Sequence, residues 1–399
     1  MSTAQADMAA LPPPRGAVVL GADFQALGLV RSLGRRGIPV YVCSAHTDIA
    51  RFSRYAAACL RLPEGGNGTR LLRFLLGLAV ERRLAGWLLF PNDDDQVEFL
   101  SRHHAELSRF YRVCVPQEEA VAIVSDKRLT YGFAQEHGIP APRTWTPENE
   151  EELAGLKCPY PVILKPARRN PFFRLTGRKA FRADDWRELV ALYRRLAPLV
   201  APGGLMVQEL IPGGPRGLYS FAALAAAGEP VAWLVANRLR QHPMDFGRAT
   251  TFATTVTNPE LAALGRRILK RLSFDGLCEV EFMHDPRDGA YKFLEINARI
   301  WGWHSLGAAA GIDFPYLLFR LAAGKTCEAA PGRQGARWVR LLTDLPTAAA
   351  EVVRGRLGWR EMVDSYRSLG TTDAVYAKDD PMPFFMELML LPYLIRKKR

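Results

Sequence analysis

The sequence has few of the features that mark disulfide-rich, zinc-binding or membrane-spanning proteins. Its six cysteines are scattered, and none forms a CxxC pair, which predicts reduced and mostly buried thiols. No apolar run is long enough to cross a bilayer, because the closest, residues 384–395, is interrupted by Glu387 and Pro392. The start of the chain lacks a basic stretch followed by an apolar core, so we expect residues 1–15 to be a disordered lead-in and not a signal peptide. These absences predict a cytoplasmic protein.

Other absences limit the ligands of the chain. No zinc-finger spacing and no RNA-binding aromatic signature occur, so we expect no nucleic acid partner. Gly21 and Gly28 do not form a GxGxxG motif, so a dinucleotide fingerprint is missing. Lys and Arg nevertheless exceed Asp and Glu by 53 to 41, and the net charge of +12 favours an anionic partner such as a nucleotide, an acidic substrate or an anionic membrane surface.

The first part of the chain, residues 16–115, alternates short apolar strands with helical segments. We expect strands at residues 17–20, 40–43, 87–90 and 112–115. Alternation of this kind builds a parallel, doubly wound α/β sheet. The polar run at residues 92–95 directly follows a strand, where ligands gather in open α/β sheets, but it also suits the cap of the next helix. The sequence leaves both roles open.

The rest of the chain mixes strands and helices. The patterns predict strands at residues 159–166, 205–211, 219–225 and 231–237, and helices at residues 128–137, 184–196 and 259–272. Residues 167–179 form a basic loop without regular periodicity. A helical stretch follows Gly302 as far as Ala323, and residues 326–399 are expected to be less regular and partly helical.

Residues 276–302, GLCEVEFMHDPRDGAYKFLEINARIWG, are the most informative stretch. Two apolar runs flank turn residues 285–289, which predicts a β-hairpin. Residues two apart on a strand share a face, so one face should carry Glu279, Glu281, Glu295 and Asn297. Three carboxylates and an amide on one face would be repulsive without a cation, and their hard oxygens suit Mg²⁺. A solvated strand face is the alternative, but the core-like second strand and the following Arg299 favour a metal and phosphate site.

Five motifs occur in an order and spacing that resemble an ATP-grasp ligase. They are SDK with Lys127, VILKP with Lys165, QELIPG at residues 208–213, EVEF at residues 279–282 and EINAR at residues 295–299. The chain is most similar to the predicted carboxylate–amine ligases of that superfamily, the group that contains D-aspartate ligase, and the resemblance spans about residues 16–325. It implies an α/β fold with an N-terminal doubly wound (pre-ATP-grasp) domain at residues 16–115 and a two-lobed ATP-grasp domain at residues 116–325. The lid lobe would cover about residues 125–205, the metal-binding lobe about residues 206–325, and a small C-terminal region residues 326–399.

The resemblance also assigns roles to the motif residues. The implied ligands are Lys127 and Lys165 for the phosphates of ATP, Gln208, Glu209 and Ile211 for the base and ribose, and Glu281, Glu295 and Asn297 for Mg²⁺ or Mn²⁺ in its place. Arg299 is the implied catalytic residue, because a planar guanidinium suits a transferring phosphate. Glu279 matches the family less securely. Arg240 is a second candidate for anion contact, with a solvated or helix-pairing role equally open, and His304 is a candidate for either substrate contact or a packed position.

One departure from the family pattern lies at residues 167–180. ATP-grasp proteins usually cover the triphosphate with a glycine-rich flap whose backbone N–H groups reach the phosphate oxygens. This segment contains only Gly177 and is instead rich in cations, namely Arg168, Arg169, Arg174, Arg178 and Lys179. Side-chain cations replace the backbone donors, or the loop orders only over bound substrate. Within it we expect Lys179 to bind phosphate.

The resemblance implies a ligase that joins a small carboxylic acid to an amine through an acyl phosphate. Two alternatives remain open: an enzyme that phosphorylates bicarbonate, of the carboxylase or carbamoyl-phosphate type, and a non-catalytic nucleotide-binding protein at a membrane surface. The C-terminal segment and its basic end, residues 396–399, suit either contact with an anionic membrane or a terminal helix packed on the body. The sequence identifies neither substrate and leaves the oligomeric state, a homodimer included, undecided.

Overall fold

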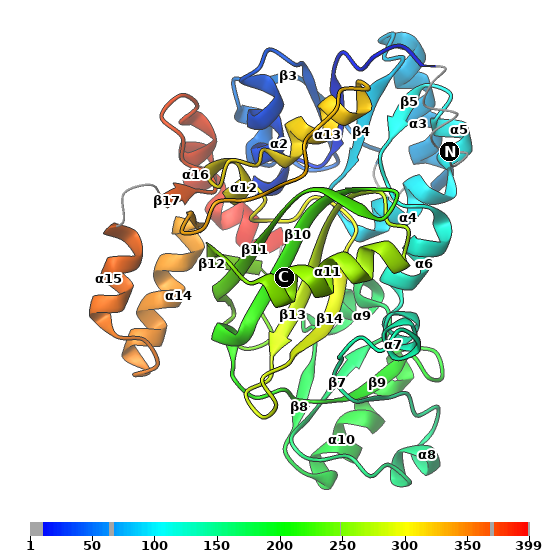
Figure 1. Cartoon of the computed structure of the whole chain (residues 1–399), viewed down its shortest axis with the longest axis vertical. Helices are drawn as coiled ribbons and strands as arrows, with labels where there is room; N and C mark the ends of the chain where they lie inside the picture. Colours follow the sequence, from blue (N-terminus) through cyan, green and yellow to red (C-terminus); the bar gives the residue numbers. More distant parts are fainter. Residues whose placement is uncertain (1–10, 64–67, 248, 368–370, 398–399) are drawn as a thin grey trace.

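Figure 1 shows the computed structural model of the chain, which describes residues 11–63, 68–247, 249–367 and 371–397. Three sheets follow one another down its long axis, with the N-terminal sheet at the top, the largest sheet in the middle and a small sheet at the bottom. The predicted lead-in, residues 1–15, lies mostly outside the described residues. None of the described helices is long and apolar enough to span a bilayer.

The N-terminal sheet contains five parallel strands in the order β3-β2-β1-β4-β5. The strands are β1 (Ala17–Leu20), β2 (Val40–Ser44), β3 (Ala56–Arg61), β4 (Trp87–Pro91) and β5 (Tyr111–Val113). Helices α2 (Phe24–Gly34), α3 (Gly68–Glu81), α4 (Asp94–Arg102) and α5 (His104–Leu107) connect or cover them, as does the 3₁₀ helix η1 (Ile49–Phe52). The predicted doubly wound α/β fold is confirmed. Only β3 was missing from the prediction, because its sequence AAACLR is rich in alanine, which is depleted in strands, and its side chains are half-buried.

The two glycines of the first turn permit close packing. A Cβ on Gly21 would lie 2.5 Å from the side chain of Asn92, and a Cβ on Gly28 would lie 2.7 Å from the ring of His304. Side chains at these positions would displace the neighbouring elements. Gly28 therefore lets helix α2 approach the segment that follows the predicted hairpin, and Gly21 lets the end of β1 approach the segment that follows β4.

The small sheet is antiparallel, with the order β6-β9-β7-β8. Its strands are β6 (Thr144–Trp145), β7 (Val162–Pro166), β8 (Phe181–Ala183) and β9 (Leu205–Glu209), and helices α8 (Glu150–Ala154), α9 (Arg169–Thr176) and α10 (Trp186–Leu196) accompany them. The prediction that residues 167–179 lack regular structure was wrong, because most of them form α9. Phe172 anchors this helix in the core, and Gly177 ends it at a left-handed φ of 66°.

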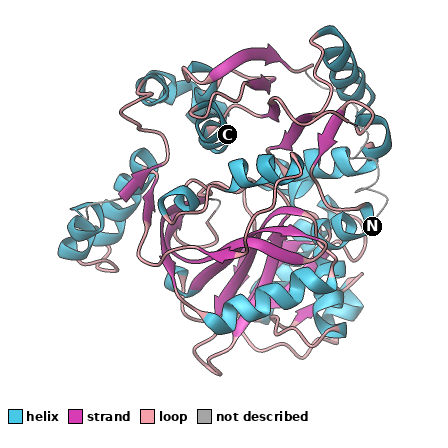
Figure 2. Cartoon of the chain, turned by 45° about the horizontal axis from the view of Figure 1, so that its top comes forward, coloured by secondary structure: helices cyan, strands magenta, loops and turns pink. Residues whose placement is uncertain are grey.

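The large sheet has the order β14-β13-β10-β11-β12-β16-β17, with β15 (Ala330–Pro331) paired beside β11. Its main strands are β10 (Leu218–Ala226), β11 (Glu229–His242), β12 (Ala249–Val256), β13 (Gly276–His284), β14 (Tyr291–Asn297), β16 (Arg337–Val339) and β17 (Thr371–Asp373). Figure 2 shows these strands side by side with helices on both faces.

Strand β10 shows how this sheet is buried on both sides. Phe221 and Ala223 belong to a core cluster with Leu261 and Ile268 of helix α11 (Pro259–Arg271). The alternate residues of β10 point the other way and pack with α2 and with α13 (Phe314–Ala322) in a second cluster. Two buried faces explain why the strand has an almost continuous apolar sequence. They also fix the N-terminal sheet and the large sheet relative to each other.

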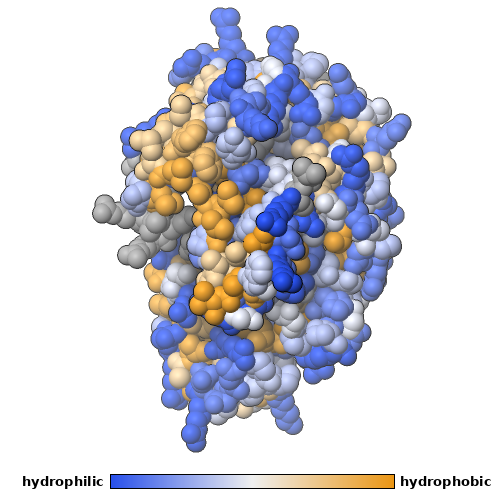
Figure 3. Space-filling view, turned by 90° about the vertical axis from the view of Figure 1, so that its left-hand side faces the viewer, coloured by the Kyte–Doolittle hydropathy of each residue, from blue (hydrophilic) through white to orange (hydrophobic). Residues whose placement is uncertain are grey.

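The remaining helices fill the connections and the C-terminal region. They are α6 (Glu118–Ser125), α7 (Lys127–Glu136), α12 (Leu306–Ala309), α14 (Leu341–Val353), α15 (Trp359–Arg367) and α16 (Met382–Lys397), with short 3₁₀ turns η2 (Ala197–Leu199) and η3 (Pro215–Gly217). Strands β16 and β17 extend the large sheet beyond β12. Because these two strands follow residue 325 in the sequence and still belong to the large sheet, the predicted end of the ATP-grasp domain at residue 325 stays a prediction. Figure 3 views the side that carries α14, α15 and α16, and apolar side chains gather there.

Asp380, just before α16, connects the C-terminal region to the N-terminal domain through hydrogen bonds. Its buried carboxylate accepts hydrogen bonds from Arg31 Nε at 3.0 Å, Ser53 Oγ at 2.6 Å and the backbone N–H of Arg54 at 3.0 Å. The Arg31 side chain is also buried. An ion pair this far from water holds both partners firmly, because breaking it would leave an uncompensated charge.

Candidate functional site

Strands β13 and β14 form the hairpin that the sequence predicts. Their antiparallel register places Glu279 opposite Asn297 and Glu281 opposite Glu295, with a shift in register just after Glu281. The four polar side chains therefore face the same way in two adjacent cross-strand pairs.

This face opens on a cavity of about 930 Å³ between the small sheet and the large sheet. A cavity of this size accommodates a nucleotide-sized ligand. It is lined by eight of the predicted site residues, namely Lys127, Lys165, Lys179, Gln208, Glu209, Ile211, Glu281 and Glu295. The structure thus brings together residues from segments far apart in the sequence.

Two cation–carboxylate pairs lie at the end of the cavity that strands β13 and β14 form. Lys127 Nζ lies 3.0 Å from Glu295 Oε2, and Arg238 Nη1 lies 2.6 Å from Glu281 Oε2. Arg238 also donates from Nε to Thr250 Oγ1 at 2.7 Å, so its guanidinium is fixed. Burial lowers its pKa, but the carboxylates of Glu281 and Glu279 outweigh this effect and the net shift is upward. Sequence reasoning did not identify Arg238, although it lines the cavity.

Lys165 is the most perturbed cation of the cavity. Its Nζ donates to Tyr131 Oη at 2.8 Å, and Tyr131 in turn donates to the carbonyl of Leu294 at 2.8 Å. Burial and, to a smaller extent, the nearby charge of Lys127 lower the pKa of Lys165 to about 7, while Glu295 acts in the opposite direction. An anion that entered the cavity beside Lys165 would raise this pKa and favour the protonated, positively charged form of the side chain.

Glu279 lies behind the cavity and does not line it. Its carboxylate accepts hydrogen bonds from Ser220 Oγ at 2.9 Å, Trp303 Nε1 at 2.9 Å and Asn297 Nδ2 at 3.1 Å. Burial raises its pKa to about 7, and the adjacent Glu281 adds to the shift. Arg238 Nη1 also lies 3.4 Å from Glu279 Oε1. The buried Glu279 carboxylate therefore orients the side chains of Asn297 and Arg238.

Asn297 lines a smaller cavity of about 120 Å³, whereas Arg299 lines neither this cavity nor the larger one. Asn297 lines this cavity together with Lys127 and Glu295, and donates to Glu281 Oε1 at 2.9 Å. Arg299 Nε donates to Asp94 Oδ1 at 2.7 Å, which links the hairpin to the N-terminal domain. Arg299 is therefore held by a carboxylate beside the cavity and does not line the larger one.

The cap role of the polar run after β4 is confirmed, and its contact with a ligand stays a prediction. Asp93 caps helix α4, since its side chain accepts from the backbone N–H of Gln96 at 2.8 Å. Asp94 and Asp95 line the smaller cavity with Asn297. The cap and the cavity lining thus come from different residues of the same run.

The predicted base-binding segment at the end of β9 is anchored to neighbouring strands. Gln208 Nε2 donates to Thr144 Oγ1 at 2.7 Å. The Glu209 carboxylate accepts from the backbone N–H of Arg143 at 2.9 Å and from Arg287 Nη2 at 3.2 Å. These bonds fix the segment that carries Ile211 along the cavity wall.

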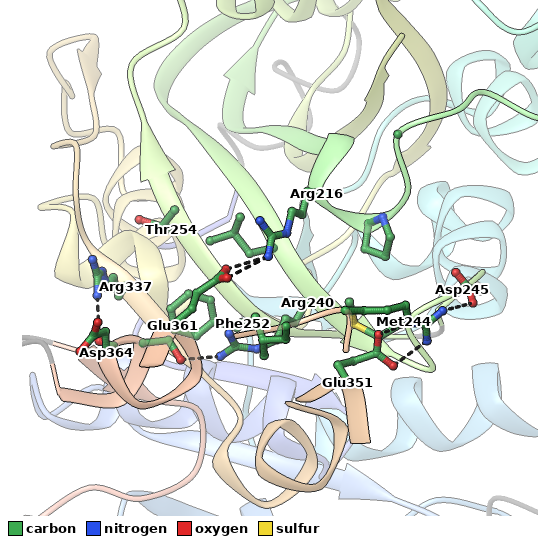
Figure 4. Close-up of a pocket in the computed structure, with 16 residues that line it drawn as sticks. Arg216, Arg240, Met244, Asp245, Phe252, Thr254, Arg337, Glu351, Glu361 and Asp364 are labelled. Atoms are coloured by element: carbon green, nitrogen blue, oxygen red, sulfur yellow. Dashed lines mark hydrogen bonds and ion pairs between the residues drawn. The ribbon is translucent and has the colours of Figure 1, made fainter. Parts of the chain in front are cut away.

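Two weaker candidates from the sequence have structural partners elsewhere. Arg240 donates to the buried Asp344 of helix α14 at 2.9 and 2.7 Å and lines a third cavity of about 550 Å³ (Figure 4), so the helix-pairing alternative holds and Arg240 does not line the 930 Å³ cavity. A shift in register of β11 next to Arg240 explains why it does not follow Arg238 toward the larger cavity. His304 is packed: its ring contacts the carbonyl of Trp301 at 2.8 Å, and burial lowers its pKa to about 4.

The basic segment around α9 reaches across to the N-terminal domain. Arg168 lies 3.4 Å from Glu98 and 3.6 Å from Asp126, and Arg174 lies 3.7 Å from Asp95. Lys179 lines the large cavity. These exposed pairs are individually weak, but they give the arginines partners other than a phosphate.

The chemistry of the hairpin face suits a hard divalent cation. Glu281 and Glu295 present carboxylate oxygens to the cavity, and Asn297 adds an amide oxygen on the same face. Oxygen donors of this kind fit Mg²⁺. Among the residues described, no group of three or more His, Cys, Asp or Glu side chains is placed to hold a metal. The set of two glutamates and one asparagine therefore remains a prediction.

Comparisons with known proteins agree with this geometry. Residues 204–344 match the family described as ATP-grasp in the biosynthetic pathway with Ter operon. The chain is 24% identical over 298 residues to a D-aspartate ligase of Enterococcus faecium, covering 71% of this chain and 70% of the ligase. It is 23% identical over 227 residues to the carbamoyl phosphate synthase large chain of Methanothermobacter thermautotrophicus, but that match covers only 21% of the synthase.

Solved structures with the same fold include two enzymes of different activity. An L-amino acid ligase from Bacillus licheniformis superposes with a TM-score of 0.58 at 16% identity, covering 78% of this chain and 74% of the ligase. A biotin carboxylase from Campylobacter jejuni superposes with a TM-score of 0.63 at 17% identity, covering 80% and 74%. At these identities the likeness concerns the fold.

Proposed function

We propose that this chain, whose residues 204–344 match an ATP-grasp family, is an ATP-dependent ligase that joins a carboxylate to an amine. The proposal divides the chain into a pre-ATP-grasp domain at residues 16–115, an ATP-grasp domain at residues 116–325 and a C-terminal region. It places the reaction in the cytoplasm, and the free thiols of all six cysteines are compatible with that compartment.

The observation that carries the proposal is the meeting of opposite charges at one end of one cavity. Lys127, Lys165 and Arg238 supply cations there, while Glu281 and Glu295 supply carboxylates. A cavity with both signs of charge suits a triphosphate bound together with a divalent metal. The apolar Ile163 and Ile211 line the same cavity and suit a nucleobase.

In this proposal Glu281, Glu295 and Asn297 hold Mg²⁺, which when bound neutralises phosphate charge. Lys127 and Lys165 of the lid lobe donate to phosphate oxygens, and Lys179 of the same lobe reaches the same anion. Gln208, Glu209 and Ile211 position the base and ribose. Arg299, oriented by Asp94 at 2.7 Å, stabilises the phosphate group during its transfer.

The proposed reaction has two steps. A carboxylate oxygen of the acid attacks the γ-phosphorus of ATP, the bond to the bridging oxygen of ADP breaks, and an acyl phosphate forms. The nitrogen of the amine then attacks the acyl carbon, loses a proton and displaces phosphate, which gives an amide. The chain contributes position and charge, and walls that exclude water protect the mixed anhydride.

A bicarbonate-phosphorylating enzyme is the second candidate, since fold relatives include biotin carboxylases and a carbamoyl phosphate synthase. The D-aspartate ligase match favours amide formation, because it covers 70% of that relative whereas the synthase match covers 21%. A single assay separates the two. Phosphate release from ATP is measured with a panel of acids, with a panel of amines, with both, and with bicarbonate alone.

The expected result is release of phosphate that requires both an acid and an amine. Release with bicarbonate alone would reassign the reaction to the second candidate. Nucleotide binding with no release in any mixture would leave a non-catalytic nucleotide-binding protein. Contact with an anionic membrane, the other partner predicted from the sequence, concerns a different surface of the molecule.

A further inference from the structure

Helix α16 exposes an unusual amount of apolar surface. Six of its large apolar side chains are exposed to between 41% and 74%: Met382, Phe385, Leu388, Met389, Leu391 and Tyr393. The buried side of the helix is narrow and includes Pro383 and Glu387, one turn apart. Exposed apolar patches of this kind on a folded protein mark a contact with another molecule or a membrane.

Over the residues described, the exposed face of this helix carries no negative charge. Its only acidic residue, Glu387, is turned inward, where it accepts from Arg340 Nη2 at 2.8 Å and is 3% exposed. No carboxylate accompanies the six exposed apolar side chains between Met382 and Tyr393. The sequence then continues into Arg396, Lys397, Lys398 and Arg399, of which the last two lie beyond the residues that the structure describes.

The body of the protein holds the helix with this face outward. Asp380, two residues before α16, is tied to Arg31 and Ser53 of the N-terminal domain, and Glu387 is tied to Arg340. Phe384 adds ring contacts to Tyr376 and Phe385, with centroids 5.6 and 5.9 Å apart. Figure 3 shows apolar side chains gathered on the side of the molecule that carries α16 and α14.

We propose that α16 is an interfacial helix that binds the surface of an anionic lipid bilayer. Its apolar side chains would enter the boundary between headgroups and acyl chains while the following cations contact anionic headgroups. The charge of the surface favours lipid over a second copy of the chain, because each copy carries a net charge of +12 and the helix has no exposed carboxylate to pair with the cations. The proposal does not depend on the ligase activity.

The test is co-sedimentation of the full chain with vesicles of phosphatidylcholine alone and of phosphatidylcholine mixed with phosphatidylserine. We expect binding to the mixed vesicles only, and weaker binding as salt is raised. Replacing residues 396–399 by glutamine should weaken binding by more than about 100-fold, since each of the four cations near an anionic surface contributes about fivefold.

The apolar face is tested by the double variant F385D and M389D. A matched control is V80D with L199D, because Val80 on α3 and Leu199 in η2 are also exposed, to 64% and 40%. We expect the first variant to lose vesicle binding and the control to keep it, with far-ultraviolet circular dichroism and nucleotide binding unchanged in both. Wild-type protein that ignores anionic vesicles would overturn the proposal. A concentration-dependent dimer in light scattering that the α16 variant abolishes would instead assign the face to a second copy.

Discussion

Replacing Glu295 by glutamine should separate metal binding from folding. The substitution keeps the size of the side chain and removes the charge that faces Lys127 at 3.0 Å. The two side chains are 20% and 16% exposed, so the pair contributes only about 1 kcal/mol or less to the free energy of unfolding. As a proposed direct ligand, however, Glu295 should matter more to Mg²⁺ than the outer groups whose loss weakens metal binding about 10–100-fold.

The measurement is the affinity for ADP by calorimetry, once with excess Mg²⁺ and once with a chelator. Wild-type protein should bind ADP more tightly with Mg²⁺, and E295Q should lose at least about 100-fold of that gain while its urea midpoint changes little. E229Q is the control, because Glu229 pairs with Lys270 at the same 3.0 Å on an exposed surface far from the cavity. A variant with the full Mg²⁺-dependent gain would refute the assignment of Glu295 as a ligand.

Three further predictions follow from the same contacts. The pKa of Lys165 is lowered to about 7, and a bound phosphate would raise it, so the protein should take up a proton when it binds ADP at pH 8. Calorimetry in buffers of different ionisation enthalpy should detect this uptake in the wild-type protein and not in K165M. R238M should lower the free energy of unfolding by about 3–5 kcal/mol, because it leaves buried Glu279 and Glu281 without their cation. The control R216M breaks an exposed pair with Glu361 and should lower the free energy of unfolding by about 1 kcal/mol or less in urea titrations. Equal losses in the two variants would contradict the argument. D94N should reduce kcat about tenfold with little change in the KM for ATP, since it weakens the charged hydrogen bond that orients Arg299. The neighbouring variant D95N should change neither, because the exposed Asp95 carboxylate lies 3.7 Å from Arg174, and it is Asp94 that accepts from Arg299.

The parts of the fold that depend on local patterns could be predicted from the sequence. The β13–β14 hairpin follows from period-two alternation and a strong turn, and its face follows directly from the parity of Glu279, Glu281, Glu295 and Asn297. The first parallel strands are short apolar runs buried on both sides. Such features require no knowledge of distant partners.

Features that depend on distant partners could not be predicted. The sequence pattern ended β11 at Asn237, because polar residues follow, yet the strand continues to His242 with Arg238 and Arg240 buried. Their burial is possible only because Glu281 and Asp344 come from other segments to pair with them. Strands β16 and β17 have three residues each and gain their order from β12. They are too short to show a period of their own.

The bond between Arg31 and Asp380 has a consequence for how the protein is made. The two residues are 349 positions apart, and at a synthesis rate of 5–20 residues per second the ribosome needs roughly 20–70 s to pass from one to the other. The nascent N-terminal domain therefore spends that time with the Arg31 guanidinium lacking its carboxylate and with the docking surface of α2 uncovered. Its final surface is completed only near the end of translation.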